Sequence, residues 1–191
     1  MRITSARFLA AASDGSHLPQ HQWPEIAFAG RSNVGKSSLL NRLTGQHKLA
    51  RVSKTPGRTQ QLNFFLINDA VVFVDLPGYG FARVPLAVKA QWRTLVESYL
   101  TVGHMLRAVV VIVDIRRGVE PDDQQLLDFL AAHHIRSILV ATKADKLKRN
   151  DLVRQTAALR RAAPSELHVV SSHTGDGIAA FSQALAATAG L

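Results

Sequence analysis

The sequence predicts an α/β fold in three layers, with helices on both faces of a mostly parallel six-stranded sheet that contains one antiparallel strand. Two observations predict it. Short apolar runs alternate with segments of helical periodicity along most of the chain. In addition, the glycine-rich segment GRSNVGKS at residues 30–37 lies between an apolar run and a helical pattern. With 191 residues, 47% of them hydrophobic, the chain suits one compact domain. We expect residues 1–22 to be a poorly structured or strand-forming lead-in and residues 23–191 to form that domain.

The first half of the chain predicts three strands. The apolar run at 25–29 precedes the glycine-rich segment, and a helix should follow from Ser38. The segments QLNFFLI at 61–67 and AVVFVDL at 70–76 are rich in strand-forming residues, and the turn dipeptide Asn68-Asp69 joins them. These two strands should therefore form a hairpin, which supplies the antiparallel strand of the sheet.

The second half predicts a helix–strand alternation. Residues 88–100 place apolar side chains at helical spacing, and the fully apolar run within 107–114 is a buried strand. A helix should begin at Pro121, and strands are expected at 135–141 and 167–170. The remaining helices are expected at about 150–161 and around the inward-facing residues Ile178, Phe181 and Leu185.

The segment at residues 30–37 has the residues needed to bind a triphosphate. Gly30 and Gly35 lack a Cβ, so the backbone N–H groups between them can curl around a phosphate at the N-terminus of the following helix. Lys36 can reach the β- and γ-phosphates, and the Ser37 hydroxyl can hold a bridging Mg²⁺ ion. The alternative is a glycine turn that only caps a helix.

Two further motifs stand at the carboxyl ends of predicted strands, where a single site would form. Asp75 in the DLPG segment can hold Mg²⁺ through a water, and the Gly78 N–H can contact a γ-phosphate and sense its loss. In TKAD at 142–145, Asp145 can accept both the N1–H and the exocyclic amine of guanine, which selects GTP over ATP. Lys143 should lie across the base. A simple turn and a helix-capping aspartate are the plain structural alternatives.

Two loops complete the predicted site. The polar loop that begins at Ser171 can supply backbone N–H groups to the guanine oxygen. The segment LARVSKTPGRTQ at 49–60 should become ordered when a threonine meets Mg²⁺ and the γ-phosphate. Thr59 is the candidate because it stands just before a strand, with Thr55 as the second choice. An ordinary surface loop is the alternative.

Charge and composition narrow the class of partner. The formal charge of +9 points to a polyanion, and because no membrane-binding helix or spanning run is evident, RNA is favoured over a membrane. Solvated surface charge is the alternative. The absence of cysteine excludes disulfides, thiolate metal sites and a cysteine nucleophile, and it is compatible with a cytoplasmic location.

Taken together, GRSNVGKSSLLN, SKTPGRTQ, VDLPGYGFA, TKADK and VSS resemble the EngB family of bacterial GTPases, over nearly the whole chain. The resemblance implies a Ras-like P-loop domain, Mg²⁺-dependent GTP hydrolysis to GDP, and a role in assembling the large ribosomal subunit on which cell division and septation depend. We expect a monomer. The nucleotide-binding residues that it implies are Gly30, Arg31, Ser32, Asn33, Val34, Gly35, Lys36, Ser37, Gly57, Arg58, Thr59, Gln60, Gln61, Asp75, Leu76, Pro77, Gly78, Thr142, Lys143, Ala144, Asp145, Val170, Ser171 and Ser172.

For the reaction itself, the expected metal ligands are Ser37, Thr59 and Asp75, and the expected catalytic residues are Lys36, Thr59, Gly78 and Asn33. Tyr79 stands where Ras-like enzymes carry a water-orienting glutamine, which predicts slow intrinsic turnover. Asn33 lies where related GTPases place an asparagine that helps to hold K⁺, so K⁺ activation is an expectation. Two departures from the common pattern are Thr142, where many G proteins have asparagine, and His173 in the last loop.

Two other functions were considered. A P-loop kinase would transfer the γ-phosphate to an acceptor, but it would need no guanine-reading TKAD. A scaffold that binds GTP with negligible turnover would carry the same motifs.

Overall fold

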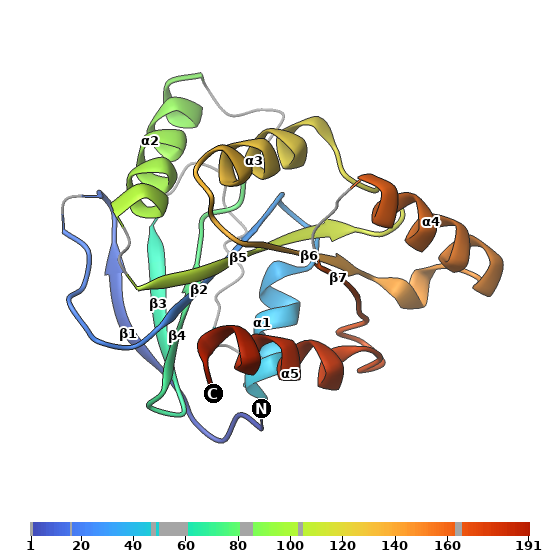
Figure 1. Ribbon diagram of the computed structural model, residues 1–191, viewed down its shortest axis with the longest axis horizontal. Coiled ribbons are helices and arrows are strands. Elements are labelled where there is room, and N and C mark those ends of the chain that lie inside the picture. Colours follow the sequence, from blue (N-terminus) through green and yellow to red (C-terminus); the bar gives the residue numbers. More distant parts are fainter. Residues whose placement is uncertain are drawn as a thin grey trace.

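The computed structural model describes residues 2–15, 17–46, 49, 61–80, 86–102, 105–162 and 166–191, without the side chains of 86–89 and 92 (Figure 1). Its elements, in chain order, are β1 (Ala6–Ala12), β2 (Glu25–Gly30), α1 (Lys36–Thr44), β3 (Leu62–Ile67), β4 (Val71–Asp75), α2 (Leu86–Val102), β5 (Leu106–Asp114), α3 (Pro121–Ala132), β6 (Ser137–Thr142), the short 3₁₀ helix η1 (Ala144–Lys146), α4 (Arg149–Ala162), β7 (Glu166–Val169) and α5 (Ile178–Ala189).

The strands form one sheet in the order β1-β3-β4-β2-β5-β6-β7. The five strands from β4 to β7 in this order are parallel, and β3 is antiparallel to both of its neighbours. The predicted α/β class and the single antiparallel strand are therefore confirmed.

The sheet has seven strands in the described residues, and the expected number of six is wrong by one. The additional strand is β1, which pairs with β3 from Ala6 opposite Ile67 to Ala12 opposite Leu62. Asn68 holds the start of this strand, because its Oδ1 accepts the N–H groups of Thr4 and Ser5 at 2.8 and 3.0 Å. Pairing with β1 satisfies backbone groups that β3 would otherwise expose at a sheet edge. Only Ala12 of β1 is fully buried, as expected of a strand at the edge of the sheet.

The two faces of the sheet bury different helices, as Figure 1 shows: α1 and α5 lie on one side, and α2, α3 and α4 lie on the other. Successive residues of β2 point to opposite faces, so that Phe28 packs in the cluster with α1 and α5, and Ala27 in the other. Burial on both faces explains the near-continuous apolar runs of the central strands.

The expected hairpin is also present. Asn68 and Asp69 both have positive φ, 51° and 50°, which suits a two-residue turn between twisted strands. Of the side chains expected to face the core from this helix, those of Leu95, Val96, Tyr99 and Leu100 are buried in α2, and that of Trp92 lies outside the described residues. No described helix is long and apolar enough to cross a membrane.

Candidate nucleotide-binding site

The glycine-rich loop runs from the end of β2 to the start of α1, as predicted, and its backbone conformation needs its glycines. A Cβ on Gly30 would lie 2.9 Å from both the Ile112 carbonyl oxygen and Val34 Cγ2. Gly35 has φ 109°, a left-handed conformation that other residues rarely adopt. Asn33 also has positive φ, 65°, which asparagine tolerates better than most residues. The loop therefore curls tightly enough to bring its N–H groups around a small anion.

Helix α1 presents a bare N-terminus to this loop. Gly35 provides no side-chain cap, and no acidic residue occupies the first turn, so the first N–H groups and the helix dipole are available to an anion. Within the first turn, Lys36 pairs through Nζ with Oδ1 of Asp75, and both side chains are largely buried. Ser37 follows on the same turn and is half-buried.

The DLPG segment lies directly against the loop. The Leu76 N–H donates to the Phe28 carbonyl at 3.0 Å, which continues the strand pairing past Asp75. A Cβ on Gly78 would lie 3.3 Å from Ser32 Oγ, and the Ser32 N–H donates to the Tyr79 carbonyl at 3.0 Å. The structure thus brings Asp75 and Gly78 beside the loop at 30–37, as the sequence predicts.

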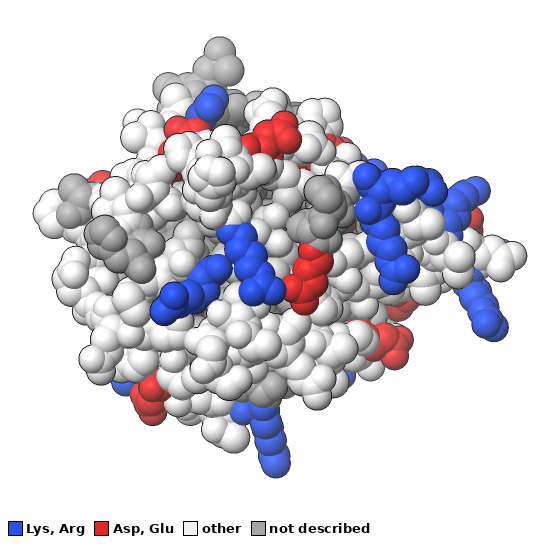
Figure 2. Space-filling view, viewed as in Figure 1, with Lys and Arg blue, Asp and Glu red and all other residues white. Residues whose placement is uncertain are grey.

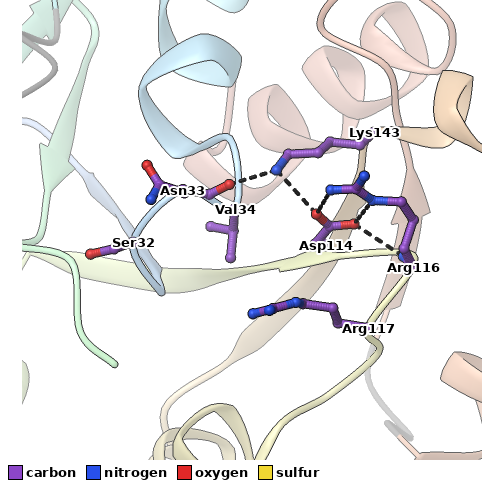
Figure 3. A pocket seen from close by; sticks show the side chains of 7 residues that line it. All are labelled: Ser32, Asn33, Val34, Asp114, Arg116, Arg117 and Lys143. Carbon is purple, nitrogen blue, oxygen red and sulfur yellow. Dashed lines mark hydrogen bonds and ion pairs between the residues drawn. The ribbon is translucent and has the colours of Figure 1, made fainter. Parts of the chain in front are cut away.

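Strand β6 is tied to the same loop by Thr142 and Lys143. The buried Thr142 hydroxyl lies 2.5 Å from the Val34 carbonyl oxygen and 3.0 Å from that of Val113, and its one hydrogen can serve either. Lys143 Nζ donates to the Asn33 carbonyl at 2.6 Å (Figure 3). The threonine that departs from the common asparagine therefore supplies a hydroxyl bond to the loop.

A residue that the sequence reasoning missed, Asp114, orients Lys143. Its Oδ2 lies 3.0 Å from Lys143 Nζ, and Arg116 donates to it through Nη2 at 2.6 Å (Figure 3). Burial alone would raise the pKa of Asp114, but the hydrogen bonds from Arg116 and Lys143 outweigh burial and lower the pKa to about 2. A carboxylate at the end of a buried strand, followed by two arginines, is the sequence signal that could have indicated this role.

These side chains line a cavity of about 270 Å³ beside the loop. Figure 3 shows Lys143 reaching across from β6, Arg116 and Arg117 following β5, and the Asn33 side chain pointing away from Lys143. The lining residues are Ser32, Asn33, Val34, Asp114, Arg116, Arg117 and Lys143.

The base-reading residues also meet. Oδ1 of Asp145 accepts the Ser171 hydroxyl at 2.7 Å, and Lys146 Nζ lies 3.4 Å from Oδ2. The hydrogen bond from Ser171 is the largest cause that lowers the pKa of Asp145. Asp145 is therefore held as a carboxylate in a fixed orientation, which is the form that can accept two donors from guanine.

The sequence predicts that backbone N–H groups in the last loop, at residues 170–172, contact the guanine oxygen. Two of these three N–H groups are bonded within the protein. The Val170 N–H donates to Ala141 at 2.8 Å, and the Ser171 N–H donates to Asp176 at 2.9 Å. Of the three residues, Ser172 alone retains an N–H without an acceptor in the described part of the chain. His173, the second departure, is exposed.

Residues 50–60 of the segment expected to meet Mg²⁺ lie outside the described residues, and with them Thr55, Gly57, Arg58, Thr59 and Gln60. Gln61 is described and is exposed just before β3. The roles predicted for these residues stay predictions.

Tyr79 joins a network that the sequence reasoning did not foresee. Its hydroxyl donates to Asp123 Oδ1 at 2.8 Å, and Asp123 Oδ2 accepts the Glu120 N–H at 2.9 Å in the capping box of α3. Arg31 of the glycine-rich loop pairs with Glu120 and lies 3.7 Å from Asp122. The loop, the segment after DLPG and the start of α3 are therefore linked by buried or half-buried contacts.

Comparison with known proteins decides the family. The model of the 50S ribosome-binding GTPase family matches residues 25–143. A probable GTP-binding protein EngB of Geobacter metallireducens is 49% identical over 161 residues, which are 84% of this chain and 79% of the relative. A second, from Exiguobacterium sibiricum, is 43% identical over 189 residues, which are 97% of this chain and 98% of the relative.

The chain belongs to the EngB family.

Solved structures agree with this EngB assignment. The crystal structure of a probable EngB GTP-binding protein is 27% identical, with a TM-score of 0.70, and the match covers 86% of this chain and 98% of the other. Era of Aquifex aeolicus, solved with GDP and AlF₄⁻, is 22% identical with a TM-score of 0.65 over 86% of this chain and 56% of Era, which shows a shared fold. As an EngB-family protein, the chain binds guanine nucleotide and hydrolyses GTP.

Proposed function

We propose that this EngB-family GTPase reads guanine through Asp145 and acts as a nucleotide switch in assembly of the large ribosomal subunit. The observation that carries the base assignment is the 2.7 Å hydrogen bond from Ser171 to Asp145, because it fixes the carboxylate at the end of the sheet where the ligand binds. Lys143 flanks the base, and the Ser172 N–H meets the guanine oxygen. The ribose and phosphates then extend toward the loop at 30–37.

The phosphates are held by the loop N–H groups, the N-terminus of α1 and Lys36. When nucleotide binds, Lys36 exchanges its ion pair with Asp75 for one with the β- and γ-phosphates. The exchange is possible because the carboxylate and the phosphates are both anionic and both lie at the N-terminus of α1. The oxygen donors of Ser37, Asp75 and Thr59 fit Mg²⁺, which prefers hydroxyls, waters and phosphates with few protein carboxylates. Consistent with this, no group of three acidic or histidine side chains that could form a separate metal cage occurs among the described residues. Bound Mg²⁺ would neutralise charge on the phosphates.

Hydrolysis relies on charge stabilisation by Lys36 and on contacts from Thr59 and the Gly78 N–H to the γ-phosphate. No protein group accepts from Gly78 in the described residues, which leaves that N–H able to bind a phosphate oxygen. Intrinsic turnover is slow, because the hydroxyl of Tyr79 is engaged with Asp123 and a phenol cannot orient water as an amide does. The exposed side chain of Asn33 supports a K⁺ ion against the phosphates.

The large-subunit role is supported by the family description, a 50S ribosome-binding GTPase, and by the formal charge of +9. A ribosomal partner places the protein in the cytoplasm, and through ribosome supply its loss would impair cell division and septation. We further propose that it acts as a monomer.

The direct test is sedimentation of the purified protein with isolated 50S and 30S subunits, loaded with a non-hydrolysable GTP analogue or with GDP. We expect co-sedimentation with 50S particles or their precursors, and a difference between the two nucleotides. The absence of association in both states would overturn the assembly role. In parallel, binding and turnover are measured with GTP, ATP and xanthosine triphosphate. If ATP is neither bound nor turned over, the kinase is excluded. If GTP is turned over, the scaffold is excluded.

A further inference from the structure

Helix α4 and the segment just before it carry a strongly basic outer surface. Between residues 146 and 161 the chain has six lysines and arginines and one acidic residue. Figure 2 shows blue side chains gathered at the right of the molecule, where α4 lies in Figure 1. We call this surface the α4 basic face and define it by Lys146, Lys148, Arg149, Arg154, Arg160 and Arg161.

The helix is oriented by its apolar side. Leu159 is buried at 2% exposure, and Leu152 packs against the same core cluster. The two residues are seven positions apart, which is about two helical turns, so they lie on the same side of α4 and fix it against the sheet. Val153 lies about 100° around the helix from Leu152 and is 64% exposed. The basic face is therefore a consequence of the core packing.

The four arginines of α4 form two rows on this outer side. At 3.6 residues per turn, Arg149 and Arg160 fall along one edge, and Arg154 and Arg161 fall along another roughly 120° around the helix. All four are exposed. The first row spans 11 residues, or about 16 Å along the axis, which is long enough to follow several consecutive phosphates of a nucleic acid.

Little of this charge is neutralised inside the protein. Arg154 pairs with Asp151 at 2.8 Å, and Lys146 lies 3.4 Å from Asp145. In the described part of the chain, Lys148, Arg149, Arg160 and Arg161 form no ion pair. Four neighbouring cations without a counter-charge create a positive field that attracts a polyanion.

We propose that the α4 basic face binds the phosphate backbone of RNA. This inference rests on the proposed ribosomal role, and it names the surface that contacts RNA. Arginine favours phosphate because its planar fork donates two hydrogen bonds at once. The exposed residues between the rows are Asn150, Val153 and Ala157, which supply neither the aromatic anchors of a protein interface nor a side chain suited to insert into a membrane.

The proposed contact is independent of the bound nucleotide. Of the residues expected to sense the γ-phosphate, Gly78 follows β4, whereas α4 packs against β7, and the strands β2, β5 and β6 lie between β4 and β7 in the sheet. Thr59 lies outside the described residues. Leu152 and Leu159 fix α4 on the core. The α4 basic face therefore anchors RNA equally in the GTP and GDP states, and state-dependent contacts must come from elsewhere.

The test compares two double variants of the full chain with equal loss of charge. Arg160→Ala/Arg161→Ala removes two unpaired arginines of the face. Arg2→Ala/Arg107→Ala removes two exposed arginines outside the face that form no ion pair within the described residues. The probe is a fluorescent RNA hairpin of about 20 base pairs, titrated by anisotropy with GDP and with a GTP analogue. A second face variant, Arg149→Ala/Arg154→Ala, repeats the test at the other end of the helix.

We expect each face variant to bind the hairpin about five- to tenfold more weakly in both nucleotide states, with a salt slope smaller by about 1.5, because two phosphate contacts are lost. The control should change affinity less than twofold, and all variants should keep their GTP turnover. Equal affinities of face and control variants, or a loss confined to one nucleotide state, would overturn the proposal.

Two further outcomes separate this inference from the proposed function. If the face variants lose 50S binding but keep hairpin binding, the face docks an acidic ribosomal protein and the RNA assignment is wrong. If the unmodified protein binds the hairpin through this face but never sediments with ribosomal particles, the RNA site stands and the assembly role fails.

Discussion

The Tyr79 hydroxyl donates a hydrogen bond of 2.8 Å to Asp123 Oδ1, and both residues are buried. Burial, with the Asp123 carboxylate beside it, raises the pKa of Tyr79 well above its ordinary value, so the phenol stays a neutral donor. The residue that follows DLPG thus connects this segment to α3. Its role in the structure is to position the backbone, while the water-orienting function of a glutamine is absent.

Tyr79→Phe should lower the free energy of unfolding by about 1–3 kcal/mol, because Asp123 Oδ1 loses its donor inside the protein. Intrinsic GTP turnover should change less than about twofold, as the hydroxyl takes no part in hydrolysis. Chemical denaturation and single-turnover assays measure the two effects. In a double-mutant cycle with Asp123→Ala, a coupling near zero would contradict the structural role.

Asp114 predicts an acid-dependent loss of stability. Its pKa of about 2 in the folded protein lies below the ordinary 3.8, so the folded state binds this proton less readily than the unfolded state. Its stabilising contribution is therefore present above pH 4 and is lost as the pH falls from about 4 to 2. After discounting for solvent screening, the contribution at neutral pH is about 1–2 kcal/mol.

The measurement is urea denaturation of the unmodified protein and of Asp114→Asn between pH 7 and pH 3. The stability difference between them should shrink toward the acid end. Arg116→Ala removes the strongest donor to Asp114 and should move this loss to higher pH. A difference that stays constant with pH would show that the charge of Asp114 contributes nothing.

Asp145 predicts a change of base preference. Asp145→Asn should weaken GTP binding and favour xanthosine triphosphate, whose 2-oxo group can accept from the new amide. Ser171→Ala should weaken GTP binding by only about fivefold, since it removes one hydrogen bond that orients the carboxylate. Competition binding with the two nucleotides measures both effects. Retained guanine preference in Asp145→Asn would refute the base assignment.

The hydrogen bond from the Thr142 hydroxyl connects β6 to the phosphate loop, and substitution of Thr142 tests what this bond contributes. Thr142→Ala leaves the buried Val34 carbonyl without its hydroxyl donor, which should cost about 1–2 kcal/mol of stability and weaken GTP binding severalfold. Thr142→Ser keeps the hydroxyl and is the matched control. If the serine and alanine variants behave alike, the hydrogen bond is not what the threonine contributes.

The role proposed for Asn33 predicts how the rate of GTP hydrolysis depends on the monovalent cation. GTP hydrolysis should be faster in K⁺ than in Na⁺ at equal ionic strength, because a bound cation offsets transition-state charge on the phosphates. Asn33→Ala should abolish this difference and leave GTP affinity nearly unchanged. Equal rates in the two salts for the unmodified protein would rule out the potassium role and favour a group supplied by the ribosome.

Most of the fold, and the places of the phosphate- and base-binding motifs, could be predicted from the amino-acid sequence. Continuous apolar runs mark strands that are buried on both faces, as in β5. Gly30 marks a close approach that a Cβ would block, and Gly35 marks a left-handed conformation that other residues rarely adopt. In a parallel sheet, motifs at the strand ends meet at one edge, so that the sequence already places Thr142 near the loop at 30–37 and Asp145 near Ser171. These features depend on residues that are close together in the chain, so they can be recognised in the sequence without the tertiary structure.

Only the tertiary structure decided which distant side chains meet. The sequence allowed a strand in the lead-in, but its pairing with β3 depends on a sheet edge that forms only when the chain folds. The bonds from Tyr79 to Asp123 and from Lys143 to Asp114 join residues 44 and 29 positions apart. Their partners are ordinary charged residues in the sequence, and they become specific because packing of the helices and strands brings them within hydrogen-bonding distance.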